Sequence, residues 1–212
     1  MTKIHTGLEL LKIEKNFQKE IKGSIGLLCH NASIDGQFNH AIEITKSLFG
    51  PRLKKLFGPQ HGLITDVQDN MIETEDFIHP HFKLPVYSLY SETRIPTDEM
   101  LEGIDTLLID LQDVGTRVYT YISTLGLIME ACGKKDIEVV ILDRPNPVGG
   151  DIIEGNVLDP SYKSFVGHFP FPMRHGLTMG EVANFCKTYG DGQCELKVIQ
   201  MEGWKRSMTF NE

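Results

Sequence analysis

Several sequence motifs that would assign a function at once are missing from this chain of 212 residues. No Gly-x-Gly-x-x-Gly follows the first strand-like run, and no Gly-x-x-x-x-Gly-Lys-Ser/Thr is present, so the dinucleotide fingerprint and the phosphate loop are both absent. Gly-x-Ser-x-Gly, the nucleophile turn of many hydrolases, is also missing. These absences weaken the interpretations as oxidoreductase, NTPase and esterase.

Cysteines and basic residues are few. The four cysteines are Cys29, Cys132, Cys186 and Cys194, without a Cys-x-x-Cys pair or a His-rich zinc spacing, and we interpret them as buried free thiols. The 29 acidic residues outnumber the 21 basic ones, which argues against attraction to nucleic acid or to an anionic membrane. We therefore expect a small-molecule partner, no metal and no other cofactor.

Long apolar runs are lacking too. None approaches the roughly 18 residues that span a bilayer, and residues 1–17 do not show a positively charged segment followed by an apolar run, as a secretory signal would. We expect a cytoplasmic location and no membrane partner. With 41% hydrophobic residues the chain can bury a full core, and we interpret residues 1–212 as one domain.

Strand-like and helix-like segments alternate along the chain. The expected strands are 24–29, 53–57, 85–90, 106–110, 138–142 and 196–199. Helical spacing is found at 7–21, 41–48, 118–132 and 178–189, and a further helix is expected to begin after Thr97. This alternation predicts an α/β fold with a doubly wound, mostly parallel, Rossmann-like sheet flanked by helices.

Two stretches lack a clean period. Residues 63–83 form a long connection, which is more often functional than accidental, and a lid is one such function. Residues 148–172 are rich in Gly and Pro, and we expect an excursion there with a short extra strand pair.

Polar segments follow five of the expected strands. They are HNAS (30–33), GPQHG (58–62), SETR (91–94), DLQDVGTR (110–117) and DRPNP (143–147). Because the carboxyl ends of parallel strands meet at one edge of the sheet, we expect these segments to converge on one crevice. For any single residue, capping a helix or pairing with a neighbour is an equally good explanation.

The polar segments and the residues beside them combine carboxylates, arginines and aromatic rings. The side chains concerned are Glu92, Asp110, Asp113, Asp143, Arg94, Arg117, Arg144, Arg174, Tyr90, Tyr119 and Tyr121. Carboxylates with stacking aromatics suit a sugar, and arginine offers a planar fork for a carboxylate or phosphate on that sugar. His30, His61 and His175 are candidate acids or bases, or alternatively hydrogen-bonding fillers of turns.

Five strings in this order resemble the family of NamZ-type exo-β-N-acetylmuramidases: LFGPQHGL, PVYSLYSETRIPTDEML, IDLQDVGTRVYTYISTL, VVILDRPNPVGG and FPMRHGLTMGE. The resemblance covers the chain from about Gly7 to its end. It implies a glycosidase site in a Rossmann-like N-terminal domain, which releases terminal N-acetylmuramic acid from peptidoglycan fragments. The substrate would be a muropeptide or amino sugar. Family members usually continue into a further α/β domain, so a C-terminal partner domain is expected, with apolar surface for it near Leu196–Trp204.

One position departs from the family pattern. Members often have Glu where this chain has Gln60, and the resemblance implies a catalytic acid there. An amide cannot transfer a proton, so either another carboxylate such as Glu92, Asp113 or Glu73 carries the chemistry, or the chain binds a sugar acid without cleaving it. Our leading pair is Glu92 as a partly desolvated acid and Asp113 as an ionised carboxylate beside Arg117, with His61 and Gln60 also in the catalytic group.

The expected substrate-binding residues come from several of the same segments. They are Asn31, Arg117, Tyr119, Asp143, Arg144, Asn146, Arg174 and His175. N-acetylmuramic acid carries a lactyl carboxylate, and Arg117, Arg144 or Arg174 would hold it. The alternative for Arg117 is a simple ion pair with Asp113 or Asp110. A scaffold domain, which would show an exposed apolar patch in place of a polar crevice, is the third possibility.

Overall fold

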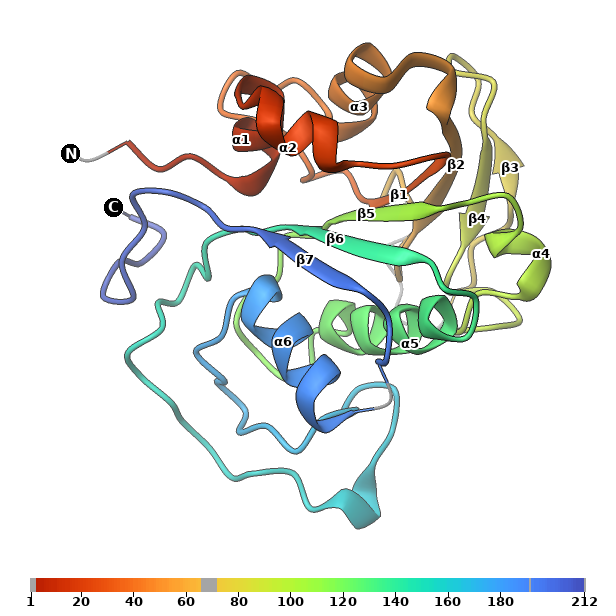
Figure 1. Ribbon diagram of the computed structural model, residues 1–212. Helices are drawn as coiled ribbons and strands as arrows, with labels where there is room; N and C mark the ends of the chain where they lie inside the picture. Colours follow the sequence, from red (N-terminus) through yellow and green to blue (C-terminus); the bar gives the residue numbers. More distant parts are fainter. Residues whose placement is uncertain (1–2, 66–71, 191, 212) are drawn as a thin grey trace.

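A single seven-stranded sheet organises the computed structural model, which describes residues 3–65, 72–190 and 192–211 (Figure 1). The strands are β1 (Ile25–Cys29), β2 (Leu53–Gly58), β3 (Phe77–Ile78), β4 (Pro85–Ser88), β5 (Thr106–Asp110), β6 (Glu138–Leu142) and β7 (Leu196–Ile199). Their order across the sheet is β3-β4-β2-β1-β5-β6-β7. All neighbours pair in parallel except β3 and β4, which are antiparallel. The predicted α/β fold with a mostly parallel sheet is confirmed.

Helices cover both faces of the sheet. They are α1 (Gly7–Ile13), α2 (Lys15–Glu20), α3 (Ala41–Phe49), α4 (Asp98–Leu101), α5 (Tyr121–Gly133) and α6 (Met179–Tyr189), with short 3-10 turns at Gly50–Arg52 and Pro160–Tyr162. Figure 1 shows α1, α2 and α3 on one face and α5 and α6 on the other. Alternate residues of β5 supply the two cores: Leu107 and Ile109 pack with α5 and α6, whereas Leu108 packs with α1 and α3.

Local sequence explains why these helices begin where they do. Thr6 with Glu9, and Thr178 with Glu181, form capping boxes that satisfy the first backbone N–H groups of α1 and α6. Thr97 caps α4 in the same way through its hydroxyl. The expected helix over 118–132 begins only at Tyr121, because the residues before it form turns that lead out of β5.

The strand order identifies where the chain reverses its direction of winding. Numbered along the chain, the parallel strands β1, β2, β4, β5, β6 and β7 lie in the order 3-2-1-4-5-6, which is the order of dinucleotide-binding sheets. The first half of the chain winds outward from β1 to β2 and β4, and the second half winds outward from β5 to β7. The reversal lies between β1 and β5, and open α/β sheets bind ligands beyond the carboxyl ends of such a strand pair.

The irregular stretches differ from expectation. The predicted strand pair in the excursion does not form within the described residues, where only isolated bridges join Glu154 to Arg174 and Ser164 to Gly167. Residues 63–83 contain the short edge strand β3, and the predicted lid lies partly in residues 66–71, outside the described part of the chain.

Two further expectations concerned exposed apolar surface and the burial of the cysteines. The apolar surface expected near Leu196–Trp204 is wrong, because Leu196 and Val198 pack against the core. The excursion carries several large exposed apolar side chains: Ile152, Ile153, Val157, Tyr162 and Val166. All four cysteines are buried free thiols, as predicted. No helix among the described residues is long and apolar enough to cross a bilayer.

Candidate functional site

The five polar segments meet at one edge of the sheet, as predicted. They follow β1, β2, β4, β5 and β6, which are neighbouring parallel strands and therefore end on the same side. A cavity of about 440 Å³ opens at this edge. It is lined by His30, Asn31, Ala32, His61, Thr65, Tyr119 and Tyr121. We call it the switch-point cleft, because its walls come from the segments after β1, β2 and β5.

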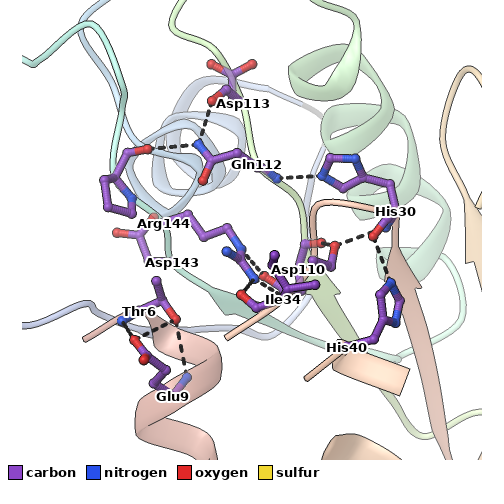
Figure 2. A network of polar contacts seen from close by, with 12 residues as sticks. Thr6, Glu9, His30, Ile34, His40, Asp110, Gln112, Asp113, Asp143 and Arg144 are labelled. Carbon is purple, nitrogen blue, oxygen red and sulfur yellow. Dashed lines mark hydrogen bonds and ion pairs between the residues drawn. The ribbon is translucent and has the colours of Figure 1, made fainter. Parts of the chain in front are cut away.

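His30 directly follows β1 and is a buried residue of the lining of the switch-point cleft. Its Nε2 lies 3.1 Å from the backbone N–H of Gln112, and its Nδ1 lies 3.2 Å from the hydroxyl of Tyr121. Burial, helped by the charges of Arg144 and His40, lowers the pKa of His30 from 6.5 to about 3. The imidazole is therefore neutral at pH 7 and takes part in fixed hydrogen bonds (Figure 2).

Two tyrosines form the aromatic wall of the cleft. Their ring centroids lie 4.5 Å apart with a tilt of 55°. Tyr121 is buried, whereas Tyr119 is half-buried. Burial raises the pKa of both phenols, and the nearby carboxylate of Asp113 raises it further. Both side chains are neutral hydroxyl groups at physiological pH.

Asp113 and His175 form a buried pair beside these tyrosines. Asp113 Oδ2 accepts a hydrogen bond from the Gly115 N–H at 2.7 Å and lies 3.3 Å from His175 Nε2. Because His175 Nδ1 accepts from the Leu177 N–H, a neutral His175 carries its proton on Nε2, toward the carboxylate. Asp113 Oδ1 is buried, and no hydrogen-bond partner for it is found among the described residues. A buried carboxylate oxygen without a partner is typical of a functional site.

The segment after β2 contributes Gln60 and His61. Gln60 is 7% exposed, and its Oε1 accepts a 2.6 Å hydrogen bond from the hydroxyl of Thr120. His61 is half-buried against the cleft, and its backbone lies in the left-handed region at φ 71°. The structure thus brings Asn31, His61 and Tyr119 together around one cavity, with Gln60 behind them.

The polar side chains of the segment after β6 are hydrogen-bonded to other parts of the protein. Arg144 donates to both carboxylate oxygens of Asp110, at 2.5 and 2.8 Å, and to the carbonyl of Ile34 at 3.0 Å (Figure 2). Asp143 accepts from the Thr178 hydroxyl and the Gly180 N–H at the start of α6. Burial raises the pKa of Asp143, opposed by these donors.

Asn146 is internal as well. Its side chain donates to the Leu177 carbonyl at 2.9 Å and accepts from the Val148 N–H at 3.0 Å. It is 3% exposed, so its expected contact with substrate has no support in this geometry.

The other two predicted arginines hold the excursion in place. Arg117 donates to the carbonyls of Asn156 and Phe171, at 2.9 and 2.6 Å. The expected position of Arg117 beside Asp113 or Asp110 is therefore wrong. Arg174 pairs with Glu154 at 2.7 Å and donates to the Val148 carbonyl.

Glu92 is exposed on the segment after β4, so the partial desolvation expected for its carboxyl is wrong in the free protein. Its neighbour Arg94 stacks on Tyr90 with 3.8 Å from guanidinium to ring centroid, and lies 5.9 Å from the ring of Phe165. Glu73 lies 3.6 Å from this guanidinium, and the Arg94 side chain is 31% exposed.

Sequence reasoning missed part of the cleft lining. His30 and Tyr121 were noted for their chemistry but not assigned to the site. Ala32 was included only as part of the HNAS segment, and Thr65 only as part of the long connection 63–83. The sequence did show that His30 directly follows the first core strand. That this strand lies at the reversal of the sheet, however, depends on the strand order, which the sequence does not give.

Three comparisons with known proteins agree. A family model described as the N-terminal part of exo-beta-N-acetylmuramidase NamZ matches residues 25–212. Peptidoglycan beta-N-acetylmuramidase NamZ of Bacillus subtilis (strain 168) is 41% identical over 211 residues, which are 99% of this chain and 50% of that protein. The crystal structure of a DUF1343 family protein (BF0371) of Bacteroides fragilis NCTC 9343 matches all of this chain and 53% of its own, with TM-score 0.86 and 41% identity.

A second DUF1343 structure from the same organism (BF0379) is 29% identical with TM-score 0.80, covering 98% of this chain and 54% of that one. The chain thus spans about half the length of the relatives it matches.

Proposed function

Since the chain belongs to the NamZ N-terminal family, as its sequence strings indicated, we propose that it carries a glycosidase site that releases terminal N-acetylmuramic acid from peptidoglycan fragments. The observation that supports this most is the switch-point cleft. Its aromatic wall, Tyr119 and Tyr121, lies at the ligand-binding edge of the sheet, and the buried carboxylate of Asp113, although outside the cavity lining, is near enough to raise the pKa of both tyrosines. Aromatic rings suit a sugar face, and glycoside hydrolysis requires carboxyl groups.

We assign the two carboxyl roles to Asp113 and Glu92. Asp113 lies 3.3 Å from the Nε2 of His175, and its other oxygen has no hydrogen-bond partner among the described residues, which suits a carboxylate that acts as base or nucleophile. Glu92 is exposed in the free protein, so a bound sugar must cover it before its pKa rises enough for general acid catalysis. Gln60 takes a positioning role, because its amide exchanges no proton.

We propose Arg94 as the ligand of the lactyl carboxylate. Arg117, Arg144 and Arg174 are held by buried or ion-paired internal partners. Arg94 donates one N–H to the Ser91 carbonyl, but it is partly exposed and its ion pair with the exposed Glu73 is long, at 3.6 Å. Its stacking on Tyr90 fixes the guanidinium plane, which favours bidentate recognition. Arg94→Lys should weaken binding of N-acetylmuramic acid more than binding of N-acetylglucosamine; equal losses would refute the assignment.

Turnover of a chromogenic β-N-acetylmuramide tests the reaction. Glu92→Gln and Asp113→Asn should each lower kcat by about 10²–10⁴-fold, the usual contribution of an acid or base. Glu195→Gln, an exposed change at the opposite edge beside the start of β7, is the matched control and should keep full activity. Turnover that survives both site changes would eliminate these assignments.

A sugar-acid binding domain without hydrolysis is the second candidate, favoured by Gln60 in place of a carboxyl group and by the exposure of Glu92. If it is correct, the wild type binds N-acetylmuramic acid without turnover, even when extended to the length of its relatives. Gln60→Glu should then create activity, because the new carboxyl lies beside the Thr120 hydroxyl. A cytoplasmic location stays a prediction, tested by cell fractionation.

We also propose that a C-terminal region, such as the relatives contain, packs against the exposed apolar side chains of the excursion. Ile152, Ile153 and Val157 are more than half exposed, which is unusual for neighbouring aliphatic residues. Polar substitutions of these residues should be neutral in this chain and should weaken association with a C-terminal region like that of the relatives, measured by size-exclusion chromatography of the two parts.

A further inference from the structure

A second cavity lies away from the switch-point cleft, between α5, α6 and the excursion (Figure 1). Its volume is about 290 Å³, close to the lower end of the range for small-molecule sites. It shares no described lining residue with the cleft. We call it the α5–α6 pocket. Its lining includes Gly126, Glu130, Lys163, Phe169, Phe185 and Tyr189.

Three aromatic rings form one wall of the α5–α6 pocket. The ring centroid of Phe185 lies 6.0 Å from that of Phe169 and 5.0 Å from that of Tyr189. Exposure increases along this row, because Phe169 is buried, Phe185 is half-buried and Tyr189 is 77% exposed. The outermost ring is therefore open to solvent at the rim of a concave site.

A glycine in the middle of α5 makes room for the innermost ring. A β-carbon at Gly126 would lie 2.6 Å from Cζ of Phe169, so a larger residue fits only if Phe169 moves. Glycine weakens the interior of a helix relative to alanine. The helix is thus weakened at the point where the excursion packs on it, and this close packing forms the inner wall of the pocket.

Charged groups of both signs complete the lining. Glu130 lies on α5 one turn beyond Gly126, and its Oε1 is 2.7 Å from Nζ of Lys134. Lys163 lies on the excursion and is exposed. One lysine beside one carboxylate does not suit a phosphate, which clustered basic residues bind, and a lipid chain would need a purely apolar lining. A sugar ring has an apolar face and a polar edge, and it matches both parts of this lining.

Helix α5 connects the pocket to the switch-point cleft. Tyr121, its first residue, lines the cleft, whereas Gly126 and Glu130 line the pocket. At 1.5 Å per residue these positions lie roughly 8 to 14 Å apart along the helix axis. This separation is within the reach of a short chain of sugar rings.

Resting on the proposed function, we propose that the α5–α6 pocket is a second sugar site. It binds an N-acetylated sugar farther along the glycan whose terminal sugar lies in the cleft. Tyr189 stacks on the ring of this sugar, and Glu130 and Lys163 form hydrogen bonds with its polar edge. The preferred substrate is then an oligosaccharide of several rings. The competing explanations are an incidental gap beneath the excursion and a contact surface for a C-terminal region like that of the relatives.

A tetramer of β-1,4-linked N-acetylglucosamine tests the pocket without any turnover. Its binding to this chain would be measured by calorimetry, and the amide NMR signals of Gly126 and Gly190, both in the pocket lining, should shift during the titration. Tyr189→Ala should weaken binding by about threefold to tenfold, the worth of one ring contact. Phe38→Ala removes a similarly exposed ring just before α3, on the other face of the sheet, and should bind as the wild type does.

Three results would overturn the proposal. The first is a wild type that does not bind the tetramer, or that binds it no better than Tyr189→Ala. The second is a set of NMR shifts confined to Asn31 and His61 of the cleft. The third is binding that disappears when the chain is extended to the length of its relatives, because the added region would then occupy the pocket. If the tetramer binds through Tyr189 and no N-acetylmuramic acid is released, the reaction proposal fails while the sugar site is retained.

Discussion

The segment after β6 and the switch-point cleft look alike in sequence and differ in the folded protein. Both place polar side chains directly after a fully buried strand. After β6, the side chains of Arg144 and Asn146 are hydrogen-bonded to other protein groups and are at most 6% exposed. In the cleft, Asn31 is exposed and Tyr119 is half-buried against a cavity. Polar residues at a strand end become a site only where the chain leaves them uncovered.

Topology explains the difference. The excursion leaves β6 and returns at residues 174–178 beside it, so the N-terminus of α6 and the backbone of Leu177 supply partners for Asp143 and Asn146. Between β1 and β5 the two halves of the chain depart in opposite directions, and no crossover covers the gap. The same residue types therefore stabilise the fold at one place and remain available to a ligand at the other.

The largest effect should follow from breaking the buried ion pair of the covered segment. Arg144→Leu leaves the Asp110 carboxylate without its cation, and we expect a loss of about 3–5 kcal/mol in the free energy of unfolding, measured with urea. Arg144→Leu combined with Asp110→Leu removes both charges and should recover much of this loss. If Arg144→Leu alone is as stable as the wild type, the Arg144–Asp110 ion pair does not stabilise the segment after β6, and the contrast with the cleft fails.

On the cleft side, acid should destabilise the protein through His30. Its pKa of about 3 in the folded state lies below the unfolded value of 6.5, so between these pH values the unfolded chain binds more protons. The stabilisation is complete above pH 6.5 and is lost as the pH falls toward 3. At about 1.4 kcal/mol per pKa unit, the loss amounts to a few kcal/mol. Urea unfolding at several pH values gives the free energy of unfolding as a function of pH. For His30→Gln this free energy should fall less steeply toward acid pH than for the wild type. An equal pH dependence in the two proteins would contradict the assignment.

A matched pair of asparagines gives the smallest and sharpest test. Asn146→Ala leaves the Leu177 carbonyl and the Val148 N–H without their partner and should cost about 1–3 kcal/mol in unfolding free energy. Asn31→Ala should change stability by less than about 0.5 kcal/mol, as is usual at exposed positions, while it weakens sugar binding. If both variants lose stability equally, the cleft is no more open than the β6 segment.

Much of the fold was predictable because its signals are local. Apolar runs such as 106–110 and 138–142 predict buried strands, and Thr178 with Glu181 predicts the start of α6. Convergence of the polar segments followed from parallel pairing alone. Strand order is not local, so the reversal between β1 and β5, and with it the importance of His30, could not be derived from the residues.

Partners distant in sequence account for the errors at the site. Arg117 was placed beside Asp113, four residues away, yet its partners are carbonyls 39 and 54 positions along the chain. Asp110 was grouped with the carboxylates that suit a sugar, yet it holds Arg144, 34 positions away. Glu92 was expected to be desolvated by the tyrosines before it, but its side chain is exposed on the turn after β4.

His61 holds a backbone conformation, φ 71°, that glycine adopts freely and that costs a residue with a β-carbon roughly 1 kcal/mol. Glycine at this position would relieve the strain and remove the imidazole from the cleft. Selection for heat resistance alone would therefore replace this histidine by glycine, whereas under the proposed function selection for sugar binding would keep it. Under that proposal, stability and ligand binding favour different residues at this position.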